Sequence, residues 1–290
     1  MDNKSTNSSV IGNQHYLYHY TTKEGFIGIL KNRCMWASNI YFMDDRSEFK
    51  FAFEILNDVI KDHKELCKLE IDIKPNKYKG TEVYSVSFSE RFDIISQWDN
   101  YTGSAPGYCI SFRKNDLNSN FKKGSEKLIK YNGKTRAIKE QYSYQFKLVK
   151  CIYDKDEQYK YVHELVNETL TNFDGKVDKI MIQTTIAEKL LEVAPLMKKD
   201  IYKEEQEWRC IITKVNDRSK LDARAGKRWP IPFYKLTVDL EKCLRDVYYG
   251  NCAEIDLEQV KDATSAICFN CGIEFSLSKN GGIYHVGNII

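Results

Sequence analysis

The charged stretch at residues 204–212, which reads EEQEWRCII, constrains the fold more than any other part of the chain. Side chains alternate across a β-strand, so a strand here places Glu205, Glu207 and Arg209 on one face and apolar side chains on the other. Burying two carboxylates and a guanidinium is costly unless the charges are paired or bind a ligand. The pattern therefore predicts a strand whose charged face is either a solvated edge or one wall of a functional site.

The rest of the chain has the composition of a folded protein. It has 290 residues, of which 42% are hydrophobic and 13% aromatic, which suffices for the core of one large domain or two smaller ones. Its 44 basic and 41 acidic residues leave a formal net charge of +3. A charge this balanced permits a polyanionic partner but does not predict one. Intrinsic disorder of the whole chain is excluded.

The sequence carries no recognisable signal for a membrane or for secretion. Residues 1–14 are rich in Ser and Asn, which predicts a mobile polar tail without the apolar segment of a signal peptide. No run approaches the roughly eighteen apolar residues that a membrane span needs. We therefore expect a cytoplasmic protein with no membrane partner.

The nine cysteines are scattered, mostly within apolar runs, as reduced and buried thiols of a cytosolic protein are. Four of them raise the question of a zinc site: Cys243, Cys252, Cys268 and Cys271. Of these, Cys268 and Cys271 have the CxxC spacing of a ligand pair, but a second such pair is missing. Core thiols are therefore the default, and no metal is expected.

Strand-like segments dominate both ends of the chain, and helical segments lie between them. Apolar residues at helical spacing predict helices near 48–60, 156–172 and 176–199, the last with Ile180 and Met181 facing inward. The Lys-rich residues 113–144 suggest a surface insertion. No strand–helix–strand rhythm repeats, so the fold class is α+β with mixed, mainly antiparallel sheets. Residues 15–290 are expected to form a single catalytic-type domain with a helical insertion at about 155–200.

Three short motifs in the first part of the chain carry polar and aromatic side chains. Tyr18-His19-Tyr20-Thr21 lies on the first predicted strand, and residues 83–89 alternate so that Ser87 and Ser89 share one face. Trp98 and Tyr101 are three residues apart, on one face of a short helix. Each motif also has an ordinary structural explanation: a histidine with satisfied hydrogen bonds, serines on a polar strand face, and aromatic core residues.

Asp44-Asp45-Arg46-Ser47-Glu48 precedes the first long helix. Asp45 at the N-cap, with Glu48 three residues later, is favourable chemistry for a helix start because both carboxylates lie near the positive end of the helix dipole. The same two carboxylates are also candidates for binding a ligand.

The chain lacks the motifs of several common enzyme classes. It contains no Walker loop, no GxGxxG, no GxSxG and no HExxH sequence. Nucleotide hydrolysis, dinucleotide-dependent redox chemistry and serine hydrolysis therefore lose support.

Five motifs together resemble a widespread bacterial family of uncharacterised proteins. That family has a Tyr-x-Tyr start, an Asn-Asp-x-x-Glu helix start, a Ser-Phe-Ser strand, a Trp-x-x-Tyr segment and a late Glu-x-Glu-x-Arg. They stand here as Tyr18–Tyr20, Asp44–Glu48, Ser87–Ser89, Trp98–Tyr101 and Glu205–Arg209, with Asp44 in place of the family's Asn. The resemblance runs over nearly the whole chain but implies no activity.

The same motifs resemble, in their order, the mono-ADP-ribosyltransferases, particularly those that modify DNA or RNA. In that superfamily a His or Arg on the first strand holds NAD, a middle strand offers Ser or Tyr, and a late strand carries the catalytic Glu, often as Glu-x-Glu. The matching positions are His19, Ser87 with Ser89, and Glu205 with Glu207. The resemblance implies an ADP-ribosyltransferase-like core that takes NAD as a substrate.

Cleavage of nicotinamide from NAD explains why such a set of residues is useful. The ribose develops oxocarbenium character, which a carboxylate stabilises more in the transition state than in the ground state. Glu207 is the candidate for that carboxylate, and Glu205 for the group that orients or deprotonates the acceptor. The expected NAD-binding residues are His19, Tyr20, Thr21, Ser87, Ser89, Trp98, Tyr101 and Arg209.

The leading hypothesis is therefore an NAD-dependent ADP-ribosyltransferase or NAD glycohydrolase. It would act as a bacterial toxin or anti-phage defence effector on a nucleic acid or protein acceptor, and an antitoxin or other regulatory partner would restrain it. One alternative is a metal-dependent protein that processes or binds nucleic acid, with a divalent ion held by Asp45, Glu48, Glu205 and Glu207. Another is a non-enzymatic interaction module. The transferase requires His19, Ser87 and Glu207 to converge, whereas the metal site requires carboxylates close enough to share an ion.

Overall fold

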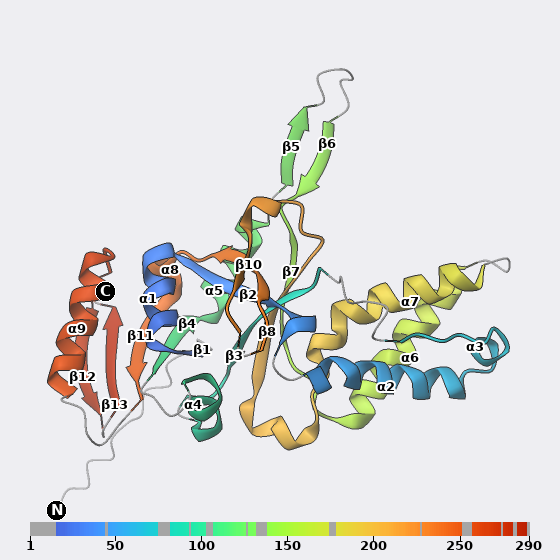
Figure 1. The fold of residues 1–290 in the computed structure, drawn as a ribbon, viewed down its shortest axis with the longest axis horizontal. Helices are drawn as coiled ribbons and strands as arrows, with labels where there is room; N and C mark the ends of the chain where they lie inside the picture. The colour runs from blue at the N-terminus through green and yellow to red at the C-terminus, as the bar shows by residue number, and fades with distance from the viewer. Residues whose placement is uncertain are drawn as a thin grey trace, which may run out of the picture.

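The computed structural model describes residues 16–43, 46–74, 82–92, 94–102, 107–125, 127–131, 138–173, 178–226, 228–250, 257–273, 275–280 and 283–288. In these residues helices pack against an open, antiparallel sheet, and a group of helices lies to one side of it (Figure 1). The α+β class predicted from the sequence is confirmed. The predicted mobile tail at residues 1–14 lies outside the described residues.

The strands are β1 (Tyr16–Thr21), β2 (Cys34–Asn39), β3 (Tyr84–Ser89), β4 (Tyr108–Arg113), β5 (Lys127–Tyr131), β6 (Ile138–Tyr142), β7 (Gln145–Lys150), β8 (Glu207–Thr213), β9 (Leu221–Arg224), β10 (Ile231–Thr237), β11 (Leu244–Tyr249), β12 (Phe275–Asn280) and β13 (Ile283–Asn288). The α-helices are α1 (Lys23–Asn32), α2 (Arg46–Asp62), α3 (Lys64–Lys68), α4 (Ile95–Thr102), α5 (Lys114–Gly124), α6 (Lys155–Thr171), α7 (Lys179–Val193), α8 (Leu240–Cys243) and α9 (Leu257–Asn270). Short 3-10 helices are η1 (Ile40–Phe42), η3 (Ala194–Leu196), η4 (Asp200–Glu205) and η5 (Arg218–Lys220).

The main sheet has the strand order β12-β13-β11-β4-β1-β3-β2-β10-β9, with β8 and β7 joined to it through β3. Strands β5 and β6 form a separate hairpin that projects away from the sheet (Figure 1). All pairings between these strands are antiparallel. The prediction of mainly antiparallel sheets is therefore confirmed.

Strand β3 is the point at which the sheet divides. One of its edges pairs with β8 over its full length, from Tyr84 to Ser89. Because a strand has two edges, β1 and β2 must share the other one: β2 pairs with Tyr84 and Ser85, and β1 pairs with Ser89. The two halves of the sheet diverge between these contacts. We call this place, residues 86–88 of β3, the sheet fork.

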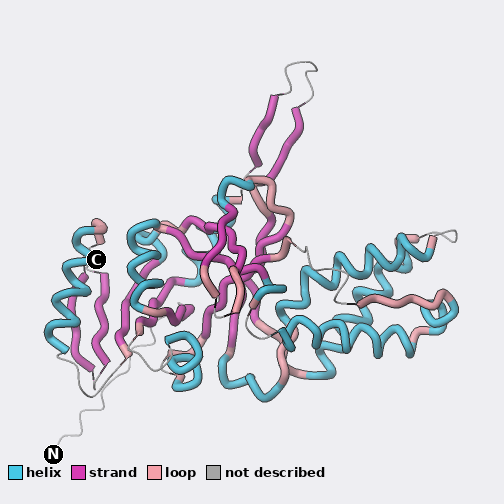
Figure 2. The backbone as a smooth tube through the Cα atoms, viewed as in Figure 1, coloured by secondary structure: helices cyan, strands magenta, loops and turns pink. Residues whose placement is uncertain are grey.

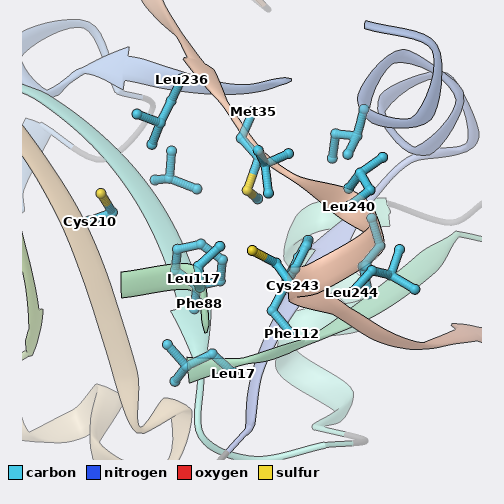
Figure 3. Close-up of a cluster of buried hydrophobic side chains, with 14 of the residues drawn as sticks. Leu17, Met35, Phe88, Phe112, Leu117, Cys210, Leu236, Leu240, Cys243 and Leu244 are labelled. Atoms are coloured by element: carbon cyan, nitrogen blue, oxygen red, sulfur yellow. The ribbon is translucent and has the colours of Figure 1, made fainter. Parts of the chain in front are cut away.

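Two hydrophobic clusters hold the described residues together. The first lies between one face of the sheet and helices α1, α5, α8 and α9, and includes Leu17, Phe88, Phe112 and Cys210 (Figure 3). The second joins α2, α3, α6, α7 and η3, the cyan helices grouped at one side of the sheet in Figure 2, to the sheet through Val83 and Ile211. The two helices predicted as an insertion thus pack with α2 and α3. The division into domains stays a prediction.

Three predictions about local structure are wrong. Residues 114–124 are not surface insertion but helix α5, in which Leu117 and Phe121 are fully buried. Helix α7 ends at Val193 rather than near 199, because Pro195 cannot continue a helix. Ile180 and Met181 face solvent in the first turn of α7, whereas Ala187, Leu190 and Leu191 further along the helix are buried.

None of the helices in the described residues is long and apolar enough to cross a membrane.

Candidate active site

The charged stretch around Glu207 folds differently from the predicted strand. Glu205 is the last residue of η4, and Gln206 adopts a left-handed conformation with φ of 41°. The strand β8 begins one residue later, at Glu207. The alternation predicted that Glu205 belongs to the strand, and this prediction is wrong. The sharp turn at Gln206 nevertheless brings the Glu205 carboxylate back beside the Glu207 carboxylate.

Four buried charged side chains meet at this point, and we call them the charge cluster: Lys198, Glu205, Glu207 and Arg209. The Lys198 ammonium donates to Glu205 Oε2 at 2.5 Å and to Glu207 Oε2 at 2.6 Å. Arg209 Nε donates to Glu207 Oε1 at 2.6 Å, and its Nη2 donates to Glu207 Oε2 at 3.0 Å. Two cations and two anions balance, so the cluster has no formal net charge.

The charge cluster is almost completely removed from solvent. Relative exposures are 4% for Lys198, 7% for Glu205, 3% for Glu207 and 3% for Arg209. Burial by itself raises the pKa of Glu207, but the nearby Arg209 and Lys198 outweigh it and lower that pKa to about 2. Glu207 is therefore ionised throughout the physiological pH range. The predicted solvated edge is excluded for this face of β8.

Neighbouring groups fix the backbone on both sides of the charge cluster. Gln158 Nε2 donates to the Lys198 carbonyl at 2.7 Å, and Arg209 Nη1 donates to the Pro195 carbonyl at 2.7 Å. The Glu207 amide donates to the Tyr153 hydroxyl at 2.9 Å. Lys198 thus extends from the segment after α7 toward β8 in a position set by several hydrogen bonds.

The sheet fork lies directly beside the charge cluster. Ser87 of β3 is opposite Arg209 of β8, and Ser89 is opposite Glu207, so these residues share one face of the sheet. The Ser87 side chain is close enough to the Tyr101 hydroxyl to lower the pKa of Tyr101. Burial raises the pKa of Tyr101, the Glu207 charge raises it further, and Arg209, Lys198 and Ser87 act against both. Tyr101 as a whole residue is 39% exposed, and the Glu207 charge still acts on its hydroxyl.

His19 occupies the sheet fork itself. Its ring nitrogen Nδ1 is 2.9 Å from the carbonyl oxygen of Ser87, at the part of β3 that pairs with neither β1 nor β2. Burial lowers the pKa of His19, and this contact opposes the shift only in part. The neutral ring with its proton on Nδ1 satisfies the carbonyl and leaves Nε2 as an acceptor. The contact is also sufficient to explain His19 structurally.

The other predicted NAD-binding residues lie around this core in structural roles. The Tyr20 hydroxyl donates to the Arg91 carbonyl at 3.3 Å, and the Tyr20 ring packs edge-on against Trp98 at 5.0 Å. The Ser89 hydroxyl donates to the Glu205 carbonyl at 2.7 Å. Thr21 is half-buried at the end of β1. These contacts attach α4 and the Glu205 turn to the sheet.

The residues needed for the metal hypothesis do not come together within the described part of the chain. Asp45 lies outside the described residues, and the Glu48 side chain is not described. Glu205 and Glu207 are close, but the Lys198 ammonium lies between them where a shared ion would sit. In the residues that the structure describes, no group of three His, Cys, Asp or Glu side chains is arranged to hold a metal.

The four cysteines considered for zinc differ in burial, and one of them is not described by the structure. Cys243 and Cys268 are buried and Cys271 is half-buried, whereas Cys252 lies outside the described residues. Burial raises the pKa of both the Cys243 and the Cys268 thiol to about 12, as expected for core thiols.

Lys198 is a central residue of the site that the sequence did not reveal. It falls in the stretch predicted as the end of a helix, where a lysine is unremarkable. A sequence signal did exist: two carboxylates on a buried face require cations, and Pro195 places the end of α7 before Lys198. Gln158 was missed for the same reason, since it contacts the segment after α7, and Tyr153 was missed because its contact with the Glu207 amide is also tertiary.

Comparison with known proteins gives one partial match. Residues 97–210 match a family model described as a protein of unknown function (DUF2971). No curated protein and no solved structure matches the chain. The resemblance to an uncharacterised family is thus found over these residues rather than over nearly the whole chain. The matched stretch contains Tyr101 and the whole charge cluster, whereas His19 and Ser87 lie before it.

Proposed function

We propose that this protein is an NAD-consuming enzyme of the ADP-ribosyltransferase type, acting as a bacterial toxin or defence effector on a nucleic acid or protein acceptor. The observation that carries the proposal is the proximity of these residues around the sheet fork. The His19 ring contacts the backbone carbonyl of Ser87, and the Ser87 side chain and the Glu207 charge both act on the Tyr101 hydroxyl. These residues come from three strands and one helix far apart in the sequence, in the order expected from the superfamily resemblance.

The state of Glu207 suits stabilisation of a cation better than proton transfer. A carboxylate with a pKa of about 2 stays ionised and is a poor base near neutral pH. It accepts three hydrogen bonds, one at Oε1 and two at Oε2, whereas a carboxylate has about four acceptor sites. Oε1 can therefore accept one more hydrogen bond, from a ribose hydroxyl. In this proposal Glu207 stabilises the oxocarbenium-like transition state electrostatically.

The neighbouring groups have separate roles in the proposal. Tyr101, whose phenol stays protonated, donates a hydrogen bond toward the ribose or packs against the nicotinamide ring. His19 offers Nε2 as an acceptor for a hydroxyl of the adenosine ribose. Glu205 is held by Lys198, so it orients the acceptor only after that bond rearranges. Arg209 holds Glu207 in place rather than contacting NAD directly.

The experiment is nicotinamide release from NAD by the purified full-length chain, alone and with single-stranded oligonucleotides or cell lysate as acceptors. Because Glu207 is buried among charges, Glu207→Ala would confound loss of chemistry with loss of folding. The informative variants are therefore Tyr101→Phe and Ser87→Ala, which delete one hydroxyl each, together with Glu207→Gln. Each should lower the rate at least tenfold while thermal unfolding shows a folded protein.

A matched control and a contrary result define the test. Glu164→Gln, at an exposed position of α6, should leave the rate unchanged. Absence of nicotinamide release under every condition, together with no thermal shift on addition of NAD, would overturn the proposal. Release that survives all three site variants would show that the NAD chemistry lies elsewhere.

A further inference from the structure

A second surface, formed by β2, β10 and β9, has the features of a binding face. Along β2, Met35 and Ala37 point into the core and are 1% and 0% exposed, whereas Trp36 between them is 45% exposed. A tryptophan that faces solvent from the middle of a strand loses the free energy it would gain by burial. Trp36 is therefore a candidate for contact with another molecule.

The exposed indole is held in a fixed orientation. Its ring is stacked on Phe233 of β10, with centroids 4.4 Å apart and planes 22° apart. Phe233 is itself buried, at 2% exposure. Phe233 thus covers one face of the indole, and the exposed part of Trp36 lies away from that contact. This arrangement preorganises a flat aromatic surface and so reduces the entropic cost of binding.

Basic side chains surround this aromatic surface. Lys235 of β10 lies directly opposite Trp36 in the strand register. Arg224 of β9 donates to the hydroxyl of Ser38, the next residue of β2 on the same face, at 3.4 Å. Lys220 is the last residue of η5, which contacts β10, and the charges of Lys235 and Lys220 both lower the pKa of the Cys34 thiol that burial raises. We call Trp36, Phe233, Lys220, Arg224 and Lys235 the aromatic–basic face.

Charge in this part of the chain is strongly biased. Residues 217–228, which contain η5 and β9, hold five basic and two acidic residues, a net charge as large as the +3 of the whole chain. Lys235 is paired with Asp222 at 2.6 Å, but both side chains are about half exposed, so water and salt weaken the pair. A polyanion can displace such a partner at little cost.

We propose that the aromatic–basic face binds single-stranded nucleic acid. An unpaired base stacks on the open face of Trp36, and the adjoining phosphates contact Lys220, Arg224 and Lys235. A duplex keeps its bases stacked on one another and cannot use Trp36 in this way. Ser38 pairs with Ser85 of β3, so this face continues into the face that carries Ser87 and Glu207.

The binding step does not depend on NAD chemistry. If the proposed function also holds, this surface assigns the acceptor to single-stranded nucleic acid rather than protein. Binding is measured on the free protein without NAD, so its failure and the failure of nicotinamide release are separate results.

The experiment is fluorescence anisotropy of labelled single-stranded DNA and RNA oligonucleotides titrated with the full-length protein at several salt concentrations. Trp36→Ala should weaken binding by about 5- to 150-fold, the range expected for loss of one base–aromatic stack. Trp36→Phe, which keeps an aromatic face, should retain most of the affinity. Lys220→Gln and Arg224→Gln should each reduce the slope of log affinity against log salt by about 0.7.

Several results would overturn the proposal. Lys160→Gln, at an exposed position of α6 remote from β2 in sequence, is the control and should bind like the wild type. Equal binding by Trp36→Ala and wild type would exclude the stack. If inorganic polyphosphate displaces the oligonucleotide as well as an unlabelled oligonucleotide does, or if duplex of the same sequence binds more tightly, the surface recognises charge alone and the proposed base stacking is wrong. No oligonucleotide binding at low salt, or binding of a protein in its place, would exclude the assigned partner.

Discussion

Replacing Lys198 with methionine tests whether the two buried carboxylates of the charge cluster need the Lys198 charge for stability. Methionine keeps the unbranched, flexible shape of the lysine stem and removes the ammonium. The change removes the Lys198 bonds to Glu205 and to Glu207, and Glu207 keeps both of its bonds to Arg209. A buried ion pair that loses one partner typically costs about 3–5 kcal/mol of stability. We expect a loss in this range at pH 8.

The pH dependence of that loss can be worked out from protonation. Glu205 can escape its unfavourable charge by binding a proton in the folded variant, whereas in the unfolded chain its pKa is about 4.3. Protonation costs about 1.4 kcal/mol for each pH unit above that value, so it limits the penalty to about 5 kcal/mol at pH 8 and about 1 kcal/mol at pH 5. The folded variant binds more protons than its unfolded chain, so its stability rises as the pH falls. The stability of Lys198→Met should therefore approach that of the wild type as the pH is lowered from 8 to 5.

A double variant separates charge balance from the loss of the lysine as such. Lys198→Met with Glu205→Gln removes one cation and one anion and leaves the Glu207–Arg209 pair intact. It should recover most of the loss, to within about 2 kcal/mol of the wild type, and should show little pH dependence. Lys147→Met is the control, because Lys147 is half exposed and pairs with Glu192 at 3.4 Å. That change should cost less than about 1 kcal/mol.

The assay is urea unfolding of all four proteins at pH 8, 6.5 and 5, followed by both tryptophan fluorescence and far-ultraviolet circular dichroism. A loss of less than about 1 kcal/mol for Lys198→Met at pH 8 would contradict the buried pair. A loss that stays constant down to pH 5 would contradict the assignment of the penalty to an ionised Glu205.

Three further predictions concern other parts of the fold. The folded pKa of Glu207, about 2, lies below its ordinary value of 4.5. Its ionisation should therefore contribute about 3 kcal/mol to the free energy of unfolding above pH 4.5, and this contribution is lost as the pH falls toward 2. Glu207→Gln should remove this pH-dependent contribution. Gly107→Ala should displace the end of α4, since the added Cβ would lie 2.1 Å from Thr102 Cγ2. It should lower the rate of NAD cleavage while the protein remains folded at the assay temperature, as its melting curve would show. Thr22→Ala should cost about 1 kcal/mol in urea unfolding by removing the cap on the Gly25 amide, whereas Thr22→Asp should be nearly neutral.

The sequence predicted the α+β class and most strands because alternation and aromatic content are local properties. It placed Glu207 and Arg209 correctly on one face of a strand. It failed at Glu205, since nothing in the pattern marks Gln206 as the residue that adopts a positive φ. A glycine at that position would have indicated the turn.

The sequence could not reveal the partner of the carboxylates. Lys198 was assigned to a helix on the strength of apolar spacing in α7, although Pro195 should have ended that helix. Its contact with Glu205 depends on how the segment after α7 crosses β8, which is a tertiary property. The exposure of Trp36 was missed for a similar reason, because it depends on β10 and β9 at the other end of the chain.

His19 and Ser87 show what a motif can and cannot predict. The His19 ring contacts the Ser87 carbonyl, and the sheet fork explains why: β3 has a stretch that pairs with neither β1 nor β2, and a side chain from β1 fills it. That requirement is met by a structural histidine as well as by a catalytic one. The sequence could therefore suggest that His19 and Ser87 lie close together, but it could not show whether His19 is structural or catalytic.

The charge cluster relates stability to the proposed chemistry. A carboxylate that must stay ionised in a buried site needs cations beside it, and Lys198 and Arg209 supply them. The same cations oppose the approach of a positively charged ribose, so catalysis requires access to the side of Glu207 that they leave open. Lys198 contacts Oε2 only, Arg209 contacts Oε1 through one hydrogen bond, and the Tyr101 hydroxyl lies in the influence of the same carboxylate. The substrate is therefore expected to reach Glu207 from the side of Tyr101 and Ser87, across the sheet fork, rather than from the side of the helices.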